Sequence, residues 1–320
     1  MKSWNVTPSE EGVTALKYVC RLLPSASMGL IRKSIRKKNI TLNGKKMEGK
    51  EHLRAGDTIS IWFSDETLTK FIGNGPSAPE DTGIFHLSDY IVYEDENILV
   101  LNKPAGILSQ GDSSGSLSLN DGVLAYLKDF MTPAFKPSIC NRLDRNTSGL
   151  VLAGKTMEAL QVLNELIRSR KVHKYYEALV LGTVESAGVF KGYMVKDREK
   201  NRVFWSEKQG RGSVPVETRY ERIKTMRKEG ITFSLVKILL VTGRSHQIRV
   251  HFQAAGHPLL GEKKYGSPES ISASEKLHIK RQMLHAFQLE FPEMDGNFSN
   301  LSGKVVEALL PEDFVKVISR

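Results

Sequence analysis

The sequence predicts an α+β fold with a large domain, built on a mostly antiparallel sheet flanked by helices, and a small N-terminal domain. Its 320 residues suffice for one large and one small domain. Candidate strands outnumber the β-α-β units that a parallel sheet would need. A stretch rich in Gly, Pro and small polar residues runs from about 64 to 83. We therefore expect domains at 1–64 and 84–320, joined by a linker at 65–83.

The first 64 residues predict two helices followed by a hairpin. Apolar residues recur at helical spacing from Val13 to Leu23, and a second apolar row begins at Met28. The dipeptide Asn43-Gly44 lies between short apolar runs, which is a strong signal for a two-residue hairpin turn. The segment DTISIWF then predicts a closing strand.

Positive charge is concentrated in this N-terminal part. The chain has a net charge of +10, and residues 30–50 contribute +7, from eight basic residues against one acidic residue. Because a solvated helix face usually interleaves both signs, we interpret the cluster as a surface for a nucleic-acid backbone. The residues expected to bind there are Arg32, Lys33, Arg36, Lys37 and Lys45.

Composition and spacing exclude several classes of protein. Cys20 and Cys140 are 120 positions apart, which fits neither a disulfide framework nor a zinc ribbon. His246, His251 and His257 lack metal-ligand spacing, and the sequence GNGP lacks the third glycine of a dinucleotide site, so we expect no metal and no cofactor. Without a signal-peptide core or an apolar run of about 18 residues, the sequence predicts a cytoplasmic protein with no membrane association.

Beyond residue 84, periodicity predicts most elements of the large domain. We expect two strands and a turn in YIVYEDENILVLNKPAG, a buried strand in GLVLAGK and a long strand in ITFSLVKILLVTG. The segment KYYEALVLGTV alternates, so Tyr176, Ala178 and Val180 should share one face. Helices are expected in DGVLAYLKDF, in TMEALQVLNELIRSRKV and in SHQIRVHFQAAG, which ends at Gly256.

One carboxylate draws attention in the segment CNRLDRNTSG, residues 140–149. Asp144 lies between Arg142 and Arg145, and the neighbouring leucines imply partial burial. Opposite charge favours the ionised carboxylate and burial disfavours it, so this position can hold a poised anion. The alternative is an aspartate that stabilises a turn, as most loop aspartates do. Arg249, on the predicted helix at 245–256, is placed to reach a carboxylate of another segment.

Five segments occur together: LNKPAG, NRLDRNTSG, KYYEALVLG, GRSHQIRVHFQAAGHPLLGEKKYG and RQMLHAFQLEFPE. They resemble the RluA-type (ribosomal large-subunit) pseudouridine synthase family, and the similarity spans about residue 84 to the C-terminus. Upstream, SIRKKNITLNGKKM and LRAGDTISIW resemble the small RNA-binding module named after ribosomal protein S-four. The resemblance implies a pseudouridine synthase fold with a helix-helix-hairpin RNA-binding domain before it.

The resemblance also implies roles for particular residues. Asp144, in the RLDxxTSG motif, is the expected nucleophile, and Arg142 is expected to help hold the place of the flipped-out nucleotide. Tyr176, in the K-x-Y-x-A pattern, is expected to stack on the uracil and to be a candidate for helping to remove its carbon-5 proton. Arg249 is the expected salt-bridge partner of Asp144. Most members of the family carry His where this chain has Asn141, which bears on the substrate subgroup rather than on activity.

The expected function is therefore that of an RNA pseudouridine synthase, which flips a uridine out of the RNA and isomerises it without a cofactor. Large-subunit ribosomal RNA is the first expected substrate and transfer RNA the second; a monomer suffices, and no obligate protein partner is expected. A non-catalytic ribosome-assembly factor is the rival, although such a relative should have lost Asp144, Tyr176 or Arg249. A nucleoside hydrolase would usually need a second carboxylate in the site, and the sequence offers no convincing one.

Overall fold

The computed structural model describes residues 1–72, 86–112, 115–197 and 202–319. The chain divides into two compact units, and the division passes through strands as well as loops. The first unit comprises Met1–Leu99, Gln110–Asn141 and Leu152–Glu165. The second comprises Val100–Ser109, Arg142–Val151 and Leu166–Arg320.

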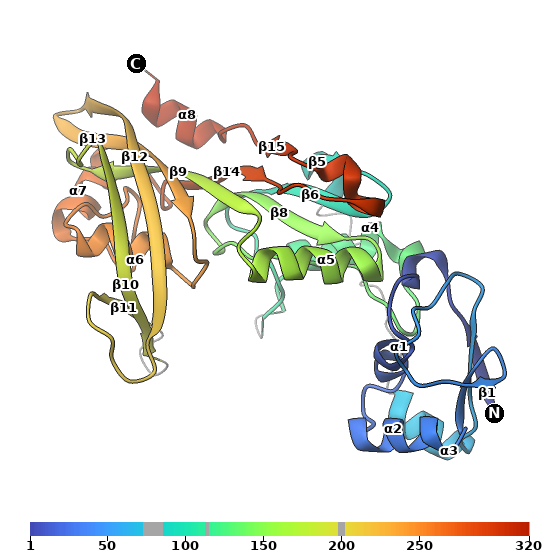
Figure 1. Ribbon diagram of the computed structural model, residues 1–320. Coiled ribbons are helices and arrows are strands. Elements are labelled where there is room, and N and C mark those ends of the chain that lie inside the picture. The colour runs from blue at the N-terminus through green and yellow to red at the C-terminus, as the bar shows by residue number, and fades with distance from the viewer. Residues whose placement is uncertain (73–85, 113–114, 198–201, 320) are drawn as a thin grey trace. The chain divides into compact units, whose positions relative to one another are not determined.

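The N-terminal segment of the first unit folds into helices and a four-stranded antiparallel sheet with the order β1-β4-β2-β3 (Figure 1). Its elements are β1 (Lys2–Asn5), α1 (Ala15–Leu22), α2 (Met28–Arg36), β2 (Ile40–Leu42), β3 (Lys45–Lys46), β4 (Thr58–Ile61) and α3 (Asp65–Ile72). Both predicted helices and the closing strand are confirmed. The predicted hairpin turn is confirmed too, since Asn43 and Gly44 have φ values of 50° and 72°, as a type I′ turn requires.

Helix α3 lies within the segment 65–83, whose composition predicts a linker. Its Leu68 side chain is 3% exposed and belongs to the same apolar core as Val19 of α1. Burial of this side chain stabilises a helix over the first eight residues of the segment that its composition had assigned to a linker. The rest of that segment, 73–83, lies outside the described residues. Phe135 and Met157 also join this core from later in the chain.

The larger sheet has the strand order β11-β10-β12-β13-β9-β14-β8-β6-β5, with β15 paired to β14 and β7 to β8. Its strands are β5 (Ile91–Glu94), β6 (Ile98–Lys103), β7 (Ser138–Ile139), β8 (Ser148–Gly154), β9 (His173–Leu181), β10 (Ala187–Asp197), β11 (Arg202–Ser206), β12 (Val214–Lys228), β13 (Ile231–Leu240), β14 (Leu284–Glu290) and β15 (Val305–Glu307). The pairing of β14 with β8 is parallel, whereas the neighbouring pairs from β11 through β9 to β14 are antiparallel. The predicted α+β class with a mostly antiparallel sheet is confirmed.

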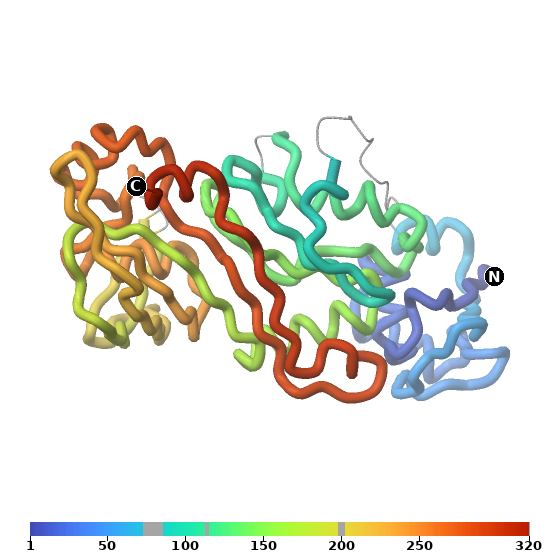
Figure 2. Tube along the Cα trace, turned by 90° about the horizontal axis from the view of Figure 1, so that it is seen from above, coloured from blue at the N-terminus to red at the C-terminus, as the bar shows by residue number. Residues whose placement is uncertain are grey.

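Helices accompany this sheet. They are α4 (Leu119–Tyr126), α5 (Met157–Arg168), α6 (Gln247–Ala254), α7 (Pro268–Lys276) and α8 (Glu312–Ile318), with short 3₁₀ helices at Pro8–Glu10, Leu87–Tyr90, Lys128–Phe130 and Gly296–Leu301. Figure 1 shows the long strands β10, β12 and β13 side by side, and Figure 2 shows β14 and β15 running together. In the described residues, no helix has the length and apolar character needed to span a bilayer.

The sheet positions the residues of interest through β9 and β13. In β9, Tyr176, Ala178 and Val180 are all buried, which confirms the predicted shared face. Tyr176 pairs with Ile238 of β13, so the tyrosine lies inside the sheet rather than at its edge. Strand β13 leads directly into α6, the helix that carries Arg249.

Candidate active site

The loop that carries Asp144 is fixed by the segment LNKPAG. Lys103 is fully buried, and its Nζ donates to the carbonyl oxygens of Pro104 (2.8 Å), Ile107 (2.8 Å) and Arg145 (3.1 Å). The Gly106 amide also donates to the Arg145 carbonyl, at 2.9 Å. Burial, followed by the charge of Arg281, lowers the pKa of Lys103 to about 7. A single lysine thus ties the loop at 104–107 to the loop that carries Asp144.

A second set of bonds holds the residue before Asp144. The Ser109 hydroxyl donates to the carbonyl of Leu143 at 2.8 Å and accepts from its amide at 2.9 Å. After Asp144, the Thr147 amide donates to the Asp144 carbonyl at 3.0 Å, which closes a turn. Because backbone groups on both sides are bonded, the carboxylate is displayed from a rigid loop.

The Asp144 side chain is 26% exposed, so it is neither sealed in the interior nor fully solvated. Arg249 Nη1 donates to its Oδ2 at 2.6 Å, from a position 105 residues further along the chain. Among the residues that the structure describes, none bonds to the other oxygen, Oδ1. The sequence neighbours take other directions, since Arg142 is exposed and Arg145 donates Nε to the Gly106 carbonyl at 3.0 Å.

Glu262 is the second carboxylate at this site. Its side chain is fully buried, and it receives Arg249 Nε at 2.6 Å and Nη2 at 2.9 Å. The amides of Lys264 and Tyr265 donate to the same carboxylate at 2.8 and 3.2 Å. Burial alone would raise the pKa of Glu262, but the bonds and charge of Arg249 outweigh it and lower that pKa. Burial alone would lower the pKa of Arg249. The bonds and charge of Glu262, followed by those of Asp144, outweigh burial and raise that pKa.

The start of helix α6 is locked by Gln247. Its side-chain oxygen accepts from the Thr242 hydroxyl at 2.8 Å, and its Nε2 donates to the Glu217 carbonyl at 3.0 Å. The preceding residue, His246, adopts a left-handed backbone with φ of 58°, and its Nδ1 lies 2.7 Å from the Tyr265 hydroxyl. The sequence GRSHQIR therefore forms a bonded corner that aims Arg249 at the two carboxylates.

Tyr176 lies close enough to Asp144 for the two to interact electrostatically. Its side chain is 5% exposed. Burial, followed by the negative charge of Asp144, raises the pKa of its hydroxyl. The phenol is therefore neutral near pH 7 and offers an aromatic face and a proton donor, rather than a phenolate base.

Other residues singled out by the sequence do not join this cluster. Arg142 makes no ion pair within the described residues, and Asn141 accepts from the Leu152 amide at 2.7 Å, which is a structural bond. The basic residues Arg32, Lys33, Arg36, Lys37 and Lys45 are all exposed on α2 and the hairpin of the first unit. In the described ranges, no group of three or more His, Cys, Asp and Glu side chains is placed to hold a metal ion.

Sequence reasoning missed Glu262 and Lys103 as parts of the site. Both lie in segments that carried the family resemblance, LLGEKKYG and LNKPAG, but no role followed from their spacing. An acid among lysines usually suggests a solvated surface. Only the fold brings Glu262 against Arg249, and only the fold buries Lys103 against the loop that carries Asp144.

Comparison with known proteins identifies the family. The family model described as RNA pseudouridylate synthase matches residues 97–254. The chain is 32% identical to "Ribosomal large subunit pseudouridine synthase C" of Rickettsia typhi, with 94% of each protein covered. It is also 32% identical to the protein of that name from Haemophilus influenzae, covering 91% of this chain and 87% of the relative. The chain belongs to the RNA pseudouridylate synthase family.

Solved structures of pseudouridine synthase domains share the fold. The human protein named RNA Pseudouridylate Synthase Domain Containing 1 has 26% sequence identity and a TM-score of 0.55, covering 70% of this chain and 84% of that one. Human RNA Pseudouridylate Synthase Domain Containing 4, with 24% identity and a TM-score of 0.58, covers 72% of this chain and 92% of that chain. The predicted enzyme class is confirmed: this chain is an RNA pseudouridine synthase.

Proposed function

We propose that this pseudouridine synthase modifies a uridine of large-subunit ribosomal RNA and that Asp144 is its nucleophile. The observation that carries the catalytic assignment is the half-open carboxylate of Asp144, bonded through one oxygen to Arg249. The choice of RNA is supported by relatives from Rickettsia typhi and Haemophilus influenzae, whose names specify the ribosomal large subunit.

The isomerisation of uridine to pseudouridine requires few protein groups beyond one ionised carboxylate next to the nucleotide. Isomerisation breaks the N1–C1′ bond of uridine, forms a C5–C1′ bond and moves one proton from C5 to the ring nitrogen. As the nucleophile, the Asp144 carboxylate attacks either the sugar or the base. Both routes need an ionised oxygen beside the nucleotide, and the Arg249 cation stabilises that charge. Because atoms only rearrange, no cosubstrate enters.

Tyr176 fits a stacking role better than a basic one. Its pKa is raised by burial, and the negative charge of Asp144 opposes a second negative charge nearby. A neutral phenol ring can support the uracil through its face, and stacking on an aromatic ring is worth about 1–3 kcal/mol per base. We therefore assign Tyr176 to positioning the detached base, with the proton passing to another acceptor.

A stacked base must be extruded before the carboxylate can reach it, which costs a few kcal/mol. We propose that contacts between RNA phosphates and the N-terminal module at 1–64 contribute this energy. The support is the exposed cluster on α2 and the β2–β3 hairpin, whose members make no ion pair within the described residues: Arg32, Lys33, Arg36, Lys37 and Lys45. One polypeptide supplies every group named here, so a monomer suffices. We propose that it acts in the cytoplasm.

The catalytic assignment is tested by Asp144→Asn, which keeps the shape of the side chain and removes its charge. Turnover on an unmodified transcript of large-subunit ribosomal RNA should fall below detection, whereas RNA binding measured by filter retention should survive. Asp129→Asn is the matched control, because Asp129 is an exposed aspartate outside the site. Residual turnover by Asp144→Asn above about one per cent would remove Asp144 from the chemistry.

The RNA target requires a separate experiment. Pseudouridines are mapped in total RNA from cells with and without this gene, and the lost positions are assigned to ribosomal or transfer RNA. A site lost from the large subunit supports the proposal. Loss confined to transfer RNA would overturn the choice of substrate and leave the role of Asp144 intact.

A further inference from the structure

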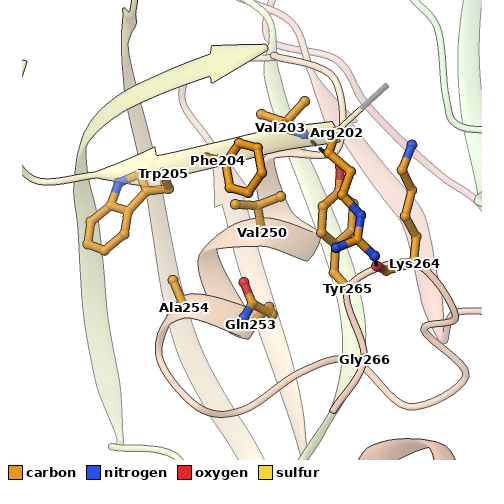
Figure 3. Close-up of a pocket in the computed structure, with 10 residues that line it drawn as sticks. All are labelled: Arg202, Val203, Phe204, Trp205, Val250, Gln253, Ala254, Lys264, Tyr265 and Gly266. Atoms are coloured by element: carbon orange, nitrogen blue, oxygen red, sulfur yellow. Dashed lines mark hydrogen bonds between the residues drawn. The ribbon is translucent and has the colours of Figure 1, made fainter. Parts of the chain in front are cut away.

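A pocket lies between strand β11 and helix α6 in the second unit, beside the Asp144–Arg249–Glu262 cluster. Its volume is about 260 Å³. Figure 3 shows Arg202, Lys264 and Tyr265 gathered at one end and Trp205 at the other, with Gln253 of α6 between them. This volume lies just below the range of about 300–1,000 Å³ that is usual for drug-sized ligands, so the pocket suits a single ring system.

The described lining of the pocket is positively charged. Arg202 and Lys264 belong to it, and none of the described lining residues is Asp or Glu. Arg202 is held in place because its Nη2 donates to the Lys264 carbonyl at 2.7 Å and its guanidinium carbon lies 5.9 Å from the centre of the Tyr265 ring. An anionic group at this end would meet two cations, which is the chemistry of a phosphate site.

Aromatic surface makes up much of the rest. The Phe204 side chain is 48% exposed at the edge of the pocket. Exposure of a large apolar ring to water is unfavourable, so a ligand that covered the ring would be stabilised. Trp205 packs edge-on against His251, with ring centres 5.8 Å apart, so its position is fixed. Gln253 is exposed and adds an amide that can both donate to and accept from a base edge.

Tyr265 connects this pocket to the catalytic cluster. The Arg249 guanidinium lies 5.4 Å from the centre of the Tyr265 ring, and the same Arg249 bonds to Asp144. The Tyr265 hydroxyl accepts from the Val203 amide of β11 at 3.1 Å. One buried ring therefore borders both the pocket and the residue that holds the nucleophile.

We infer that this pocket binds one unstacked base of the RNA strand beside the target uridine, with an adjoining phosphate on Arg202 and Lys264. The inference rests on the proposed RNA substrate. When a uridine leaves its stack, its neighbours lose a stacking partner, and exposed aromatic side chains replace it. The arrangement of cations at one end and rings along the wall matches a nucleotide, whose charge and base lie at opposite ends.

Kinetics on the ribosomal transcript test the pocket through two exposed residues. Phe204→Ala should raise KM and lower kcat/KM by about 5- to 150-fold, as expected for the loss of one stacked base, with kcat nearly unchanged. Arg202→Gln removes a phosphate contact and should also raise KM with kcat nearly unchanged. Ile223→Ala and Arg227→Gln are the matched controls, since both are exposed residues on β12. Equal kinetics for Phe204→Ala and Ile223→Ala would overturn the inference.

A binding readout separates this inference from the catalytic proposal. The chain has three tryptophans, so Trp4→Phe with Trp62→Phe leaves Trp205 as the single reporter. In that protein carrying Asp144→Asn, poly(U) should quench the Trp205 emission, and Arg202→Gln should weaken the quenching. If poly(U) binds and the Trp205 emission stays unchanged, the inference that this pocket holds a base is wrong, whether or not Asp144 is needed for turnover.

Discussion

Replacing Arg249 by Met should separate the stability of the site from its activity. Arg249 donates three charged hydrogen bonds, at 2.6 and 2.9 Å to Glu262 and at 2.6 Å to Asp144. Methionine fills much of the volume and donates none of them. It leaves the fully buried Glu262 carboxylate with backbone amide donors but without the guanidinium that pairs with it. Removing one partner of a buried ion pair costs about 3–5 kcal/mol, and we expect a loss in that range.

The double variant Arg249→Met with Glu262→Gln tests the origin of this cost. The amide oxygen of Gln can still accept from the backbone, but the buried negative charge is gone. We therefore expect the double variant to be about 2 kcal/mol more stable than Arg249→Met alone. Activity should not return, because Asp144 still lacks the cation that stabilises its charge.

The measurements are urea unfolding at pH 7 and single-turnover pseudouridine formation on the ribosomal transcript. Urea midpoints rank the variants, and Asp129→Asn sets the baseline for a surface change. A loss under about 1 kcal/mol for Arg249→Met would refute the ion-pair reasoning. So would a double variant less stable than Arg249→Met, since it would show that the stranded Glu262 charge is not what destabilises the fold.

Two further predictions concern charge. Reversing Arg32, Lys33 and Arg36 of α2, together with Lys37 at its C-terminal end, to Glu should weaken binding of the ribosomal transcript. The dependence of log K on log salt should become shallower by about 0.7–0.9 per lost phosphate contact. Reversing Lys208, Arg211, Lys224 and Arg227 should change it little, and an unchanged slope in the first variant would assign the α2 surface to another partner. Burial lowers the pKa of His251 and of His285 to about 4, so below about pH 6.5 the unfolded chain takes up protons that the folded chain refuses, and stability should fall as the pH drops from 6.5 towards 4. Each of these histidines contributes up to about 1.4 kcal/mol per pH unit to the dependence of unfolding free energy on pH. In urea unfolding, His251→Gln should make this dependence less steep, and replacing the exposed His86 by Gln should not. Equal pH dependence in the two variants would contradict the assignment to His251.

Elements with one clear period were predictable from the sequence. The apolar run in β8 is buried at every position, and the alternation in β9 places Tyr176 inside the sheet. The dipeptide Asn43-Gly44 specifies its turn locally, so no distant contact is needed. Strands β10 and β12 gave no such signal, because their less exposed faces are only partly buried and mix glycine or charged residues with the apolar ones.

The site was predictable only in part, because its contacts join segments that are far apart in the sequence. The motif around Asp144 identifies the carboxylate, but in the described part of the chain its sequence neighbours do not pair with it. Arg142 is exposed, and Arg145 bonds to the Gly106 carbonyl instead. The resemblance supplied Arg249 as the partner, and the structure has that ion pair. No sequence pattern around Glu262 predicts its role in the site, because that role depends on the Arg249 guanidinium, which only folding brings to it.

In the second unit, the carboxylates of Asp144 and Glu262 share the single guanidinium of Arg249. The resulting excess of negative charge affects which part of a nucleotide can approach Asp144. The three groups together carry one surplus negative charge, in a protein whose net charge is +10. The Lys264 cation interacts electrostatically with all three groups, so an anion is disfavoured at the Asp144 oxygens and favoured on the Lys264 side. We therefore expect the uncharged ring of a nucleotide at the Asp144 carboxylate, with phosphates held by cations such as Lys264 and Arg202.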